Sequence, residues 1–442
     1  MRQKISIGLI GLGTVGTGAF RILRDNADLI RNRVGVPVEI NKIAVRDAKR
    51  DRGITIPAGL LTTNPADVIN DPDIDIIAEL IGGYEPAKEL ILAAIARGKH
   101  VVTANKALLA AHGAEIDEAA RRAGVTIGFE ASVGGGIPVI KALKEALAAN
   151  RILSIYGIIN GTSNYILTKM TEEDRSFADV LAEAQSAGYA EADPTFDVGG
   201  IDTSHKLAIL VSLAFGAHVN VKDIYTEGIT AISPLDIDFG KVLGYKLKLL
   251  AIAKMHDDGK AEARVHPTMV PDEYPIAKVG GVYNAIQIVG NACEDIMLYG
   301  RGAGSMPTGS AVVGDIIDIA RQILMEPSRK LPALEGSDGA GSSKRLPVEL
   351  QPIESVKSLY YFRFMALDQP GVLAQISGIL GRHRISIAQM IQRGRKEGGS
   401  VPLVIMTHTA LEKDVQKAFI EIKALSCVTE DPILIRVEGK EP

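Results

Sequence analysis

The stretch Gly188–Lys206 gathers the residues best suited to chemistry. It reads GYAEADPTFDVGGIDTSHK and holds four acids and one lysine. Its glycines and proline predict mostly loop, and the pattern turns helical from Ile201. Asp202 and Lys206 are then four residues apart, on one face of the first helical turns. A lysine among carboxylates can bind the charged groups of an amino acid or transfer a proton.

A surface salt bridge is the simpler interpretation of an isolated Asp–Lys pair, because such pairs are common and contribute only about 0.3–0.5 kcal/mol. The residues that follow Lys206 argue against it here. They form a run that is apolar on nearly every side, so the helix is expected to be buried soon after it begins. Charges at the mouth of a buried helix usually face a cleft or a partner.

A dinucleotide-binding motif opens the chain. Lys4–Ile10 is an apolar run suited to a buried parallel strand, the motif GLGTVG follows at once, and residues 14–30 predict a helix. In this setting the first glycine allows a tight turn, the second lets the backbone approach a pyrophosphate, and the third lets helix and strand pack closely. A nicotinamide dinucleotide is therefore expected on Gly11, Leu12, Gly13, Thr14, Val15 and Gly16.

The end of the second predicted strand bears on the choice of nucleotide. The strand Val38–Val45 ends at Arg46, where an enzyme that uses NAD usually has an acid for the ribose 2′-hydroxyl. Arg46 favours a 2′-phosphate and hence NADP, whereas Asp47 keeps NAD open. For the charged run at 49–52, a solvated loop is a fair alternative interpretation.

Two further candidates lie after later strands. The strand His100–Thr103 ends in Ala-Asn-Lys, and ligands bind at the carboxyl ends of strands in such sheets. Lys106 is therefore a candidate, with a solvated lysine at a helix start as the equal alternative. A predicted strand at 125–130 leads to the glycine-rich loop 131–138 and a helix at 138–149. The loop could hold an anion with its amides or a cation with its carbonyls, and Glu130 favours a cation.

The order of patterns predicts an α/β fold. Residues 1–130 are expected to form a Rossmann-type doubly wound parallel sheet, completed by about residues 305–325. Residues 131–304 are expected to form an α+β substrate-binding and dimerisation domain, in which Asn160–Asn164 is a polar turn that could touch substrate. Residues 326–355 predict a linker, and residues 356–442 predict a ferredoxin-like βαββαβ domain.

Composition restricts the classes of function. The 442 residues are 46% hydrophobic and 23% charged, as expected of a globular chain with two to three domains. The net charge of −4 gives no electrostatic footprint for nucleic acid, and no stretch approaches the roughly 20 apolar residues of a membrane span. Cys293 and Cys427 lack metal-ligand spacing, and the N-terminus lacks an apolar signal core. We therefore expect a cytoplasmic protein without nucleic-acid or membrane partners.

Several of these motifs together resemble the homoserine dehydrogenase family. The resemblance covers roughly residues 1–325 and rests on GLGTVG at 11–16, TANK at 103–106, EASVGGGIP at 130–138, NGTSN at 160–164 and the opening stretch at 188–206. The tail resembles an ACT domain, with the motif DQPGVL at 368–373. This motif is a moderately specific sign of an ACT domain, and ACT domains occur on many enzymes that respond to amino acids.

The resemblance implies the reversible NAD(P)-dependent reduction of L-aspartate 4-semialdehyde to L-homoserine, in the biosynthesis of threonine, methionine and isoleucine. It implies that Lys206 is the acid/base at the aldehyde oxygen and that Asp202 keeps it protonated and oriented. Lys106 would lie near the nicotinamide and the substrate, and Gly304 near the nicotinamide.

The same resemblance implies a substrate-binding set and a cation site. Glu191 would bind the ammonium group of the substrate, helped by Asp197, with Asp202 and Thr162 in the same set. A structural Na⁺ or K⁺ would be held mainly by main-chain oxygens of the glycine loop. Its residues would be Glu130, Val133, Gly135 and Ile137.

The tail and the resemblance also suggest partners. Feedback control by a pathway end product is expected at the ACT domain, with threonine the most plausible effector. Pairing through the middle domain and between ACT domains would allow a homodimer or a homotetramer. Because the sequence begins at the dinucleotide motif, with no room for a kinase, we expect a stand-alone enzyme rather than a fusion to aspartate kinase.

Two alternatives compete with this interpretation. An aspartate semialdehyde dehydrogenase would need a cysteine that forms a thioester, and neither Cys293 nor Cys427 lies in a nucleophile-like context. A non-catalytic amino-acid sensor could combine a dinucleotide domain with an ACT domain. The intact Asp202, Lys206 and Glu191 argue against a sensor, because loss of the lysine would be the expected mark of an inactive enzyme.

Overall fold

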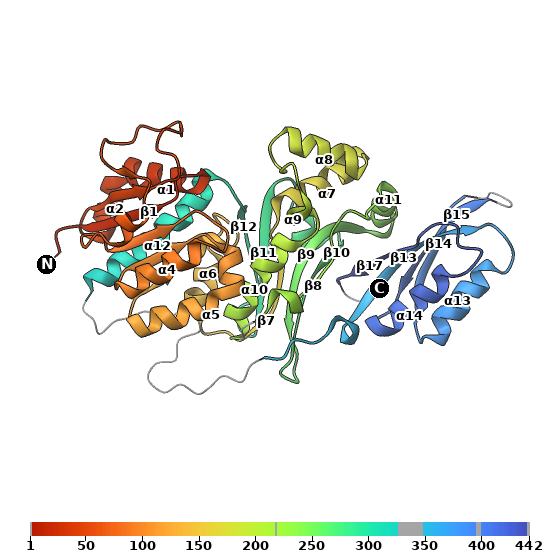
Figure 1. The fold of residues 1–442 in the computed structure, drawn as a ribbon. Helices are drawn as coiled ribbons and strands as arrows, with labels where there is room; N and C mark the ends of the chain where they lie inside the picture. Colours follow the sequence, from red (N-terminus) through yellow and green to blue (C-terminus); the bar gives the residue numbers. More distant parts are fainter. Residues whose placement is uncertain (1, 217–218, 326–347, 395–398, 440–442) are drawn as a thin grey trace. The chain divides into compact units, whose positions relative to one another are not determined.

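The structure is a computed structural model that describes residues 2–216, 219–325, 348–394 and 399–439 (Figure 1). These residues divide into two compact units. The first comprises Met1–Ser154, His205–Val221 and Tyr283–Val348, and the second comprises Ile155–Ser204, Lys222–Val282 and Glu349–Pro442. Within the described residues, no helix is long and apolar enough to cross a membrane.

A six-stranded parallel sheet organises the first unit. Its strand order is β3-β2-β1-β4-β5-β6, so the order reverses on either side of β1. All six residues of β1 are buried, as expected of a parallel strand covered on both faces. This confirms the predicted Rossmann-type sheet. The strands are β1 Ile5–Ile10, β2 Val38–Ala44, β3 Leu61–Thr62, β4 Ile76–Glu79, β5 His100–Thr103 and β6 Ile127–Gly128.

Helices cover both faces of this sheet (Figure 1). One face packs against α1, α2 and α12 through a shared apolar core, so the late helix α12 completes the early sheet. The prediction of a single helix at 14–30 was wrong, because the chain breaks at Asn26, which ends α1 and precedes α2. The helices of this unit include α1 Thr14–Asp25, α2 Ala27–Val34, α3 Ala66–Ile69, α4 Ala87–Ala96, α5 Lys106–Ala123 and α12 Ser305–Leu324.

The segment after β6 departs from the predicted strand and helix. The main chain leaves the strand early, because the amide of Glu130 donates to Asp315 at 2.8 Å, and residues Glu130–Ser132 form a 3₁₀ turn. The helix predicted at 138–149 is a short α6, Val139–Lys141, followed by a π-helical turn at Ala142–Ala146. An antiparallel hairpin of β11 Tyr283–Gly290 and β12 Glu294–Arg301 also belongs to this unit.

The second unit is built on a mixed sheet that continues into the C-terminal module. The order is β7-β9-β10-β17-β13-β15-β14, with β8 beside β10 and β16 beside β13. Strands β9 and β10 pair antiparallel along their whole length, whereas β10 and β17 pair in parallel. The strands are β7 Ile152–Ile158, β8 Tyr225–Thr226, β9 Tyr245–Met255, β10 Ala261–Pro271, β13 Lys357–Leu367, β14 Ile387–Gln392, β15 Ser400–Thr407, β16 Ala410–Leu411 and β17 Ile433–Val437.

One predicted turn in this unit is the beginning of a helix. Residues 160–164 do not form a polar turn, because the Asn160 side chain accepts from the Ser163 amide and caps α7. Ser176 caps α8 in the same way, by accepting from the Asp179 amide. The helices are α7 Gly161–Glu173, α8 Phe177–Ser186, α9 Thr195–Val198, α10 Ile201–Phe215, α11 Pro234–Leu243, α13 Val372–Arg382 and α14 Glu412–Lys423. Helix α10 contributes residues to both units. Short 3₁₀ turns lie at Val221–Asp223, Pro275–Lys278 and Ile353–Ser355.

The C-terminal module has the predicted βαββαβ order. Its core forms where α13 and α14 cover one face of the sheet, with Tyr360, Phe362 and Phe364 of β13 pointing towards them. The alternate residues Tyr361 and Arg363 point to the other face, where both donate to Asp236 of α11. Most of the predicted linker, residues 326–347, lies outside the described residues.

Candidate active site

The loop from β1 to α1 presents an open helix N-terminus. Gly11 has a φ of 105°, and a Cβ there would come within 2.8 Å of the Leu80 carbonyl. A Cβ on Gly16 would lie 2.4 Å from the Gly11 oxygen, so the turn and the helix can approach only without side chains. Gly13 has no atom within 4 Å of its Cβ position and precedes α1 without a side-chain cap. The helix amides therefore face open space suited to a pyrophosphate.

The other motif residues differ in what they expose. Leu12 is buried in the core of the sheet and can offer only its main chain to a ligand. Thr14 is exposed, and its carbonyl accepts a hydrogen bond of 2.7 Å from Ser305, the first residue of α12. Gly304 precedes that helix with a φ of 123°. The late segment around Gly304 therefore lies directly beside the dinucleotide loop.

A cavity of about 340 Å³ adjoins this loop and contains three arginines. Arg46, Arg50 and Arg52 line it together with Asp47. Arg52 donates to the carbonyls of Leu12 at 3.2 Å and Asp47 at 2.6 Å, which ties the arginine loop to the dinucleotide loop. The interpretation of 49–52 as a solvated loop does not hold for Arg52, which is half-buried and bonded to main-chain carbonyls, whereas Lys49 and Arg50 are exposed.

Polar side chains join the carboxyl ends of β4 and β5. Glu79 is fully buried, accepts from the amides of Ile81 and Gly82, and receives the Thr103 hydroxyl at 2.6 Å. Asn105 caps α5 and donates to the Gly83 carbonyl at 2.6 Å. These bonds place Lys106 as the first residue of α5, partly buried at the strand ends. The sequence analysis did not predict a role for Glu79. The sign that could have indicated it is an acidic residue at the end of a strand that is otherwise apolar.

The glycine loop offers main-chain oxygens rather than carboxylates. The Glu130 carboxylate accepts from the amides of Ile140 at 2.9 Å and Lys141 at 2.8 Å, so it caps α6 instead of pointing into the loop. Gly135 has a φ of 58°, and a Cβ there would lie 2.5 Å from the Gly302 carbonyl. In the described part of the chain, no group of three or more His, Cys, Asp or Glu side chains could hold a metal ion.

One buried atom beside this loop suits a cation. The Asn284 side-chain oxygen is buried and has no hydrogen-bond donor among the described residues. Its side chain packs on Gly302, where an added Cβ would lie 1.9 Å from the Asn284 amide nitrogen. Gly302 in turn contacts Gly135 of the loop. An unsatisfied buried oxygen next to main-chain oxygens fits a monovalent cation, which oxygen ligands would hold.

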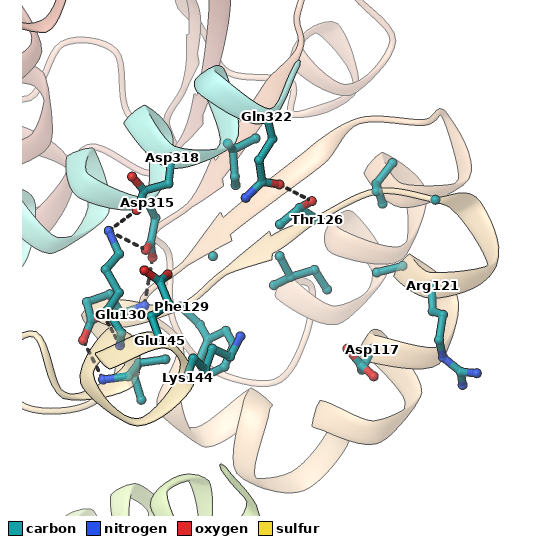
Figure 2. A pocket seen from close by; sticks show the side chains of 18 residues that line it. Asp117, Arg121, Thr126, Phe129, Glu130, Lys144, Glu145, Asp315, Asp318 and Gln322 are labelled. Carbon is teal, nitrogen blue, oxygen red and sulfur yellow. Dashed lines mark hydrogen bonds and ion pairs between the residues drawn. The ribbon is translucent and has the colours of Figure 1, made fainter. Parts of the chain in front are cut away.

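A second cavity, of about 230 Å³, is lined by Glu130, Lys141 and Asp315, among other residues (Figure 2). Burial raises the pKa of Glu130 to about 7, against the opposing effect of its two amide donors. Burial also raises the pKa of Asp315 to about 6. Lys141 contacts Asp318 and lies 3.8 Å from Asp315. This charged cluster ties the 3₁₀ turn, α6 and α12 together and so supports the glycine loop from behind.

In the second unit, the Asn160 side chain forms hydrogen bonds with two of the predicted site residues, Asp197 and Asp202. Its amide nitrogen donates to Asp197 at 2.7 Å and to Asp202 at 2.9 Å. Thr162 donates to Asp197 at 3.1 Å and to the Tyr189 carbonyl at 2.8 Å. We call Asn160, Thr162, Asp197 and Asp202 the carboxylate cluster. Two carboxylates held by one neutral amide form a natural site for an ammonium group.

The remaining residues predicted in the stretch 188–206 differ in their burial. Asp202 and Lys206 are one turn apart in α10, and both are buried, with 3% and 8% of their surface exposed. Glu191 is exposed, and its main-chain oxygen accepts from Gln185 at 3.1 Å. Sequence reasoning noticed the motif that contains Asn160 but did not predict its bonds to both acids. The signal was an asparagine at a helix N-cap directly after a strand.

Fold and site together define a class of protein. A parallel sheet with an open glycine loop, a mixed sheet that carries the partly buried carboxylate cluster, and a βαββαβ module are the parts of a nicotinamide-dependent oxidoreductase with an added ACT domain.

Comparison with known proteins identifies the family. Residues 11–130 match the model for the homoserine dehydrogenase NAD binding domain, residues 138–317 match homoserine dehydrogenase, and residues 360–426 match the ACT domain. Homoserine dehydrogenase of Pseudomonas aeruginosa is 47% identical over 439 residues, with 99% of both chains covered. That of Bacillus subtilis is 39% identical, again with 99% of both covered.

Solved structures agree. A homoserine dehydrogenase from Thiobacillus denitrificans is 46% identical, with a TM-score of 0.92 over 98% of both chains. That of S. aureus is 32% identical, with a TM-score of 0.77 over 99% of this chain and all of the other. The chain belongs to the homoserine dehydrogenase family, and it is an enzyme of that kind with an NAD-binding domain and an ACT domain.

The structure also bears on the thioester alternative. Cys293 lies in the turn between β11 and β12, with its sulfur 3.7 Å from the Glu294 carbonyl. Cys427 is buried in the apolar core of the ACT domain. Neither cysteine contacts the dinucleotide loop or the carboxylate cluster within its unit, so neither is placed as a nucleophile.

Proposed function

We propose that the enzyme interconverts L-aspartate 4-semialdehyde and L-homoserine and prefers NADP to NAD. The arginines of the nucleotide cavity support this preference, because Arg46, Arg50 and Arg52 would together attract a ribose 2′-phosphate. A hyperthermophilic archaeal homoserine dehydrogenase, 26% identical with a TM-score of 0.62, was solved in complex with NADPH.

The carboxylate cluster carries the proposal for the substrate. The bonds from Asn160 hold Asp197 and Asp202 close together at the first turn of the helix that carries Lys206. An amino acid with an ammonium group would neutralise this pair of carboxylates. We assign the ammonium group to Asp197 and Glu191, with Thr162 fixing the position of Asp197.

Reduction of the aldehyde requires a hydride at its carbon atom and a proton at its oxygen atom. The nicotinamide, when bound, supplies the hydride to the aldehyde carbon, and negative charge develops on the aldehyde oxygen. The Lys206 ammonium group stabilises this charge and donates the proton, and in the reverse direction it removes the proton from the hydroxyl. Asp202, one turn earlier, keeps Lys206 charged and oriented. Lys106 would lie near the nicotinamide and the substrate.

The remaining proposals concern structure and control. A structural Na⁺ or K⁺ would be held by main-chain oxygens of Glu130, Val133, Gly135 and Ile137, with the Asn284 side-chain oxygen beside them. The ACT domain would bind an amino-acid effector, threonine first among the candidates. Pairing of whole chains would give a homodimer or a homotetramer.

The test is an assay of homoserine oxidation. The absorbance of the reduced nucleotide is followed with L-homoserine and NADP⁺, then with NAD⁺, each with and without threonine. We expect turnover with both nucleotides, a higher kcat/KM with NADP⁺, and inhibition by threonine. A folded protein that binds nucleotide but turns over homoserine with neither nucleotide would support the sensor instead.

A further inference from the structure

The ACT domain shares a sheet with the substrate half of the second unit. Its last strand, β17, lies beside β10 (Figure 1). The two strands pair in parallel, with Arg436 opposite Thr268 and Val437 opposite Met269. The amide of Glu438 then donates to the Met269 carbonyl at 3.0 Å. The two parts are therefore joined by main-chain hydrogen bonds as well as by side chains.

Arg436 is the central side chain of this junction. It is 2% exposed, and it donates two hydrogen bonds to Glu412 of α14, at 2.8 and 2.5 Å. Its third bond leaves the ACT domain and reaches Glu227 at 2.9 Å. The guanidinium also lies 4.6 Å above the ring of Tyr225, whose hydroxyl donates to the same Glu227 carboxylate. One ACT arginine thus holds both Tyr225 and Glu227, which begin and follow β8.

The segment that Arg436 holds packs directly on α9. The amide of Glu227 donates to the Val265 carbonyl of β10 at 2.8 Å, which fixes the segment on the sheet. The next residue, Gly228, is so close to α9 that an added Cβ would lie 2.3 Å from the Val198 carbonyl. The amide of Ile229 donates to that same carbonyl at 2.9 Å. The end of α9 therefore rests on the segment that Arg436 clamps.

Helix α9 carries Asp197 of the carboxylate cluster. Asp197 is the neighbour of Val198, and its carboxylate receives Asn160 and Thr162. Its carbonyl also accepts from Ser163 at 3.0 Å. Any shift of the segment at 227–229 would therefore move Asp197 relative to the two side chains that hold it.

We propose that Arg436 is a positioning residue for the substrate site, which acts through Glu227 and the Gly228–Val198 contact on Asp197. The ACT domain would then set the affinity for the amino-acid substrate. This inference rests on the proposed assignment of the carboxylate cluster to the substrate ammonium group. It predicts that an effector bound at the ACT domain changes the KM for homoserine more than kcat.

The test uses Glu227, because loss of the buried Arg436 could prevent folding. We expect Glu227→Ala to raise the KM for L-homoserine about five-fold or more, with the KM for NADP⁺ and kcat changed less than about two-fold. Glu227→Gln keeps an acceptor for Arg436 and Tyr225 and should restore most of the affinity. The control is Lys254→Gln, because Lys254 also crosses the junction, to Glu438 at 2.8 Å, but does not contact β8.

Each outcome decides the proposal. A higher KM in Glu227→Ala, with partial recovery in Glu227→Gln and none of this in Lys254→Gln, supports it. A lower thermal midpoint with an unchanged homoserine KM would show that the contact serves stability alone and would overturn it. An equal rise of the homoserine KM in Lys254→Gln would also overturn it, because any loosening of the junction between β10 and β17 would then be enough to weaken substrate binding. A wild-type enzyme inactive with homoserine would instead refute the proposed function.

Discussion

The nucleotide cavity and the carboxylate cluster hold their binding groups by opposite means. In the nucleotide cavity, the groups proposed to bind phosphate are main-chain amides of α1, and the arginines come from one adjacent loop. In the carboxylate cluster, the groups are side chains from three helices, joined by the Asn160 amide. Main-chain groups survive the loss of a single side chain, whereas a side-chain network loses several contacts at once. Substitutions should therefore have larger effects in the cluster.

The largest loss of activity is expected at Lys206, the proposed acid/base. Lys206→Ala should lower kcat for homoserine oxidation about 10²- to 10⁴-fold, because the substrate hydroxyl loses the proposed acceptor of its proton, while the KM values stay within a few-fold. Steady-state oxidation of homoserine measures this. Lys169→Ala is the matched control, because Lys169 is a half-buried lysine of α7 that pairs with Glu173. A kcat for Lys206→Ala close to that of the control would exclude the acid/base role.

The cluster itself should come next. Asn160→Ala removes two hydrogen bonds to charged carboxylates, so Asp197 and Asp202 would repel one another. We expect kcat/KM for homoserine to fall about 100-fold, which corresponds to about 2.7 kcal/mol. Ser176→Ala is the control, since it also removes a helix N-cap in the same unit. If both variants lose only stability, the cluster has no special part in substrate binding.

The buried Lys248 tests whether the second unit, which carries the carboxylate cluster, depends on buried polar side chains for its stability. Lys248 donates to the Val279 carbonyl at 2.6 Å and contacts Asn164 of α7, and burial lowers its pKa from 10.5 to about 8. Between these values the unfolded chain binds a proton that the folded chain does not, so the stability contributed by Lys248 rises with pH.

The measurement is denaturant unfolding of wild type and Lys248→Met at about pH 7.5 and about pH 9.5. The difference in unfolding free energy, wild type minus variant, should increase by about 2 kcal/mol at the higher pH. The exposed Lys241 on α11 provides the control Lys241→Met. Parallel pH dependence of wild type and Lys248→Met would contradict the shifted pKa.

The smallest effect is expected in the nucleotide cavity. Arg46→Ala should lower kcat/KM for NADP⁺ about ten-fold, because one of the three arginines that line the cavity and are proposed to attract the 2′-phosphate is lost, and should leave NAD⁺ nearly unaffected. Lys49→Ala, in the same loop but outside the cavity lining, is the control. Equal losses with both nucleotides would mean that Arg46 does not read the 2′-phosphate, and a loss above 100-fold would remove the contrast with the cluster.

Local patterns predicted the elements whose structure depends on neighbouring residues. The strand β1, the three glycines and α1 follow from an apolar run and a motif of six residues, and the βαββαβ order of the ACT domain follows from its strand and turn signals. The errors lie where distant groups override local preference. Asp315 ends β6 by accepting from the Glu130 amide, although it lies 185 residues further along the chain.

By itself, the sequence determined which residue types are available and which backbone elements they form, because apolar period and glycine spacing act over a few residues. It marked Asp197, Asp202 and Lys206 within one stretch. The tertiary structure decided that Asn160, 37 and 42 residues earlier, holds both acids, and that Arg436 reaches Glu227 across 209 residues. These contacts depend on how strands β10 and β17 pair and how α9 packs, and no local pattern encodes that packing.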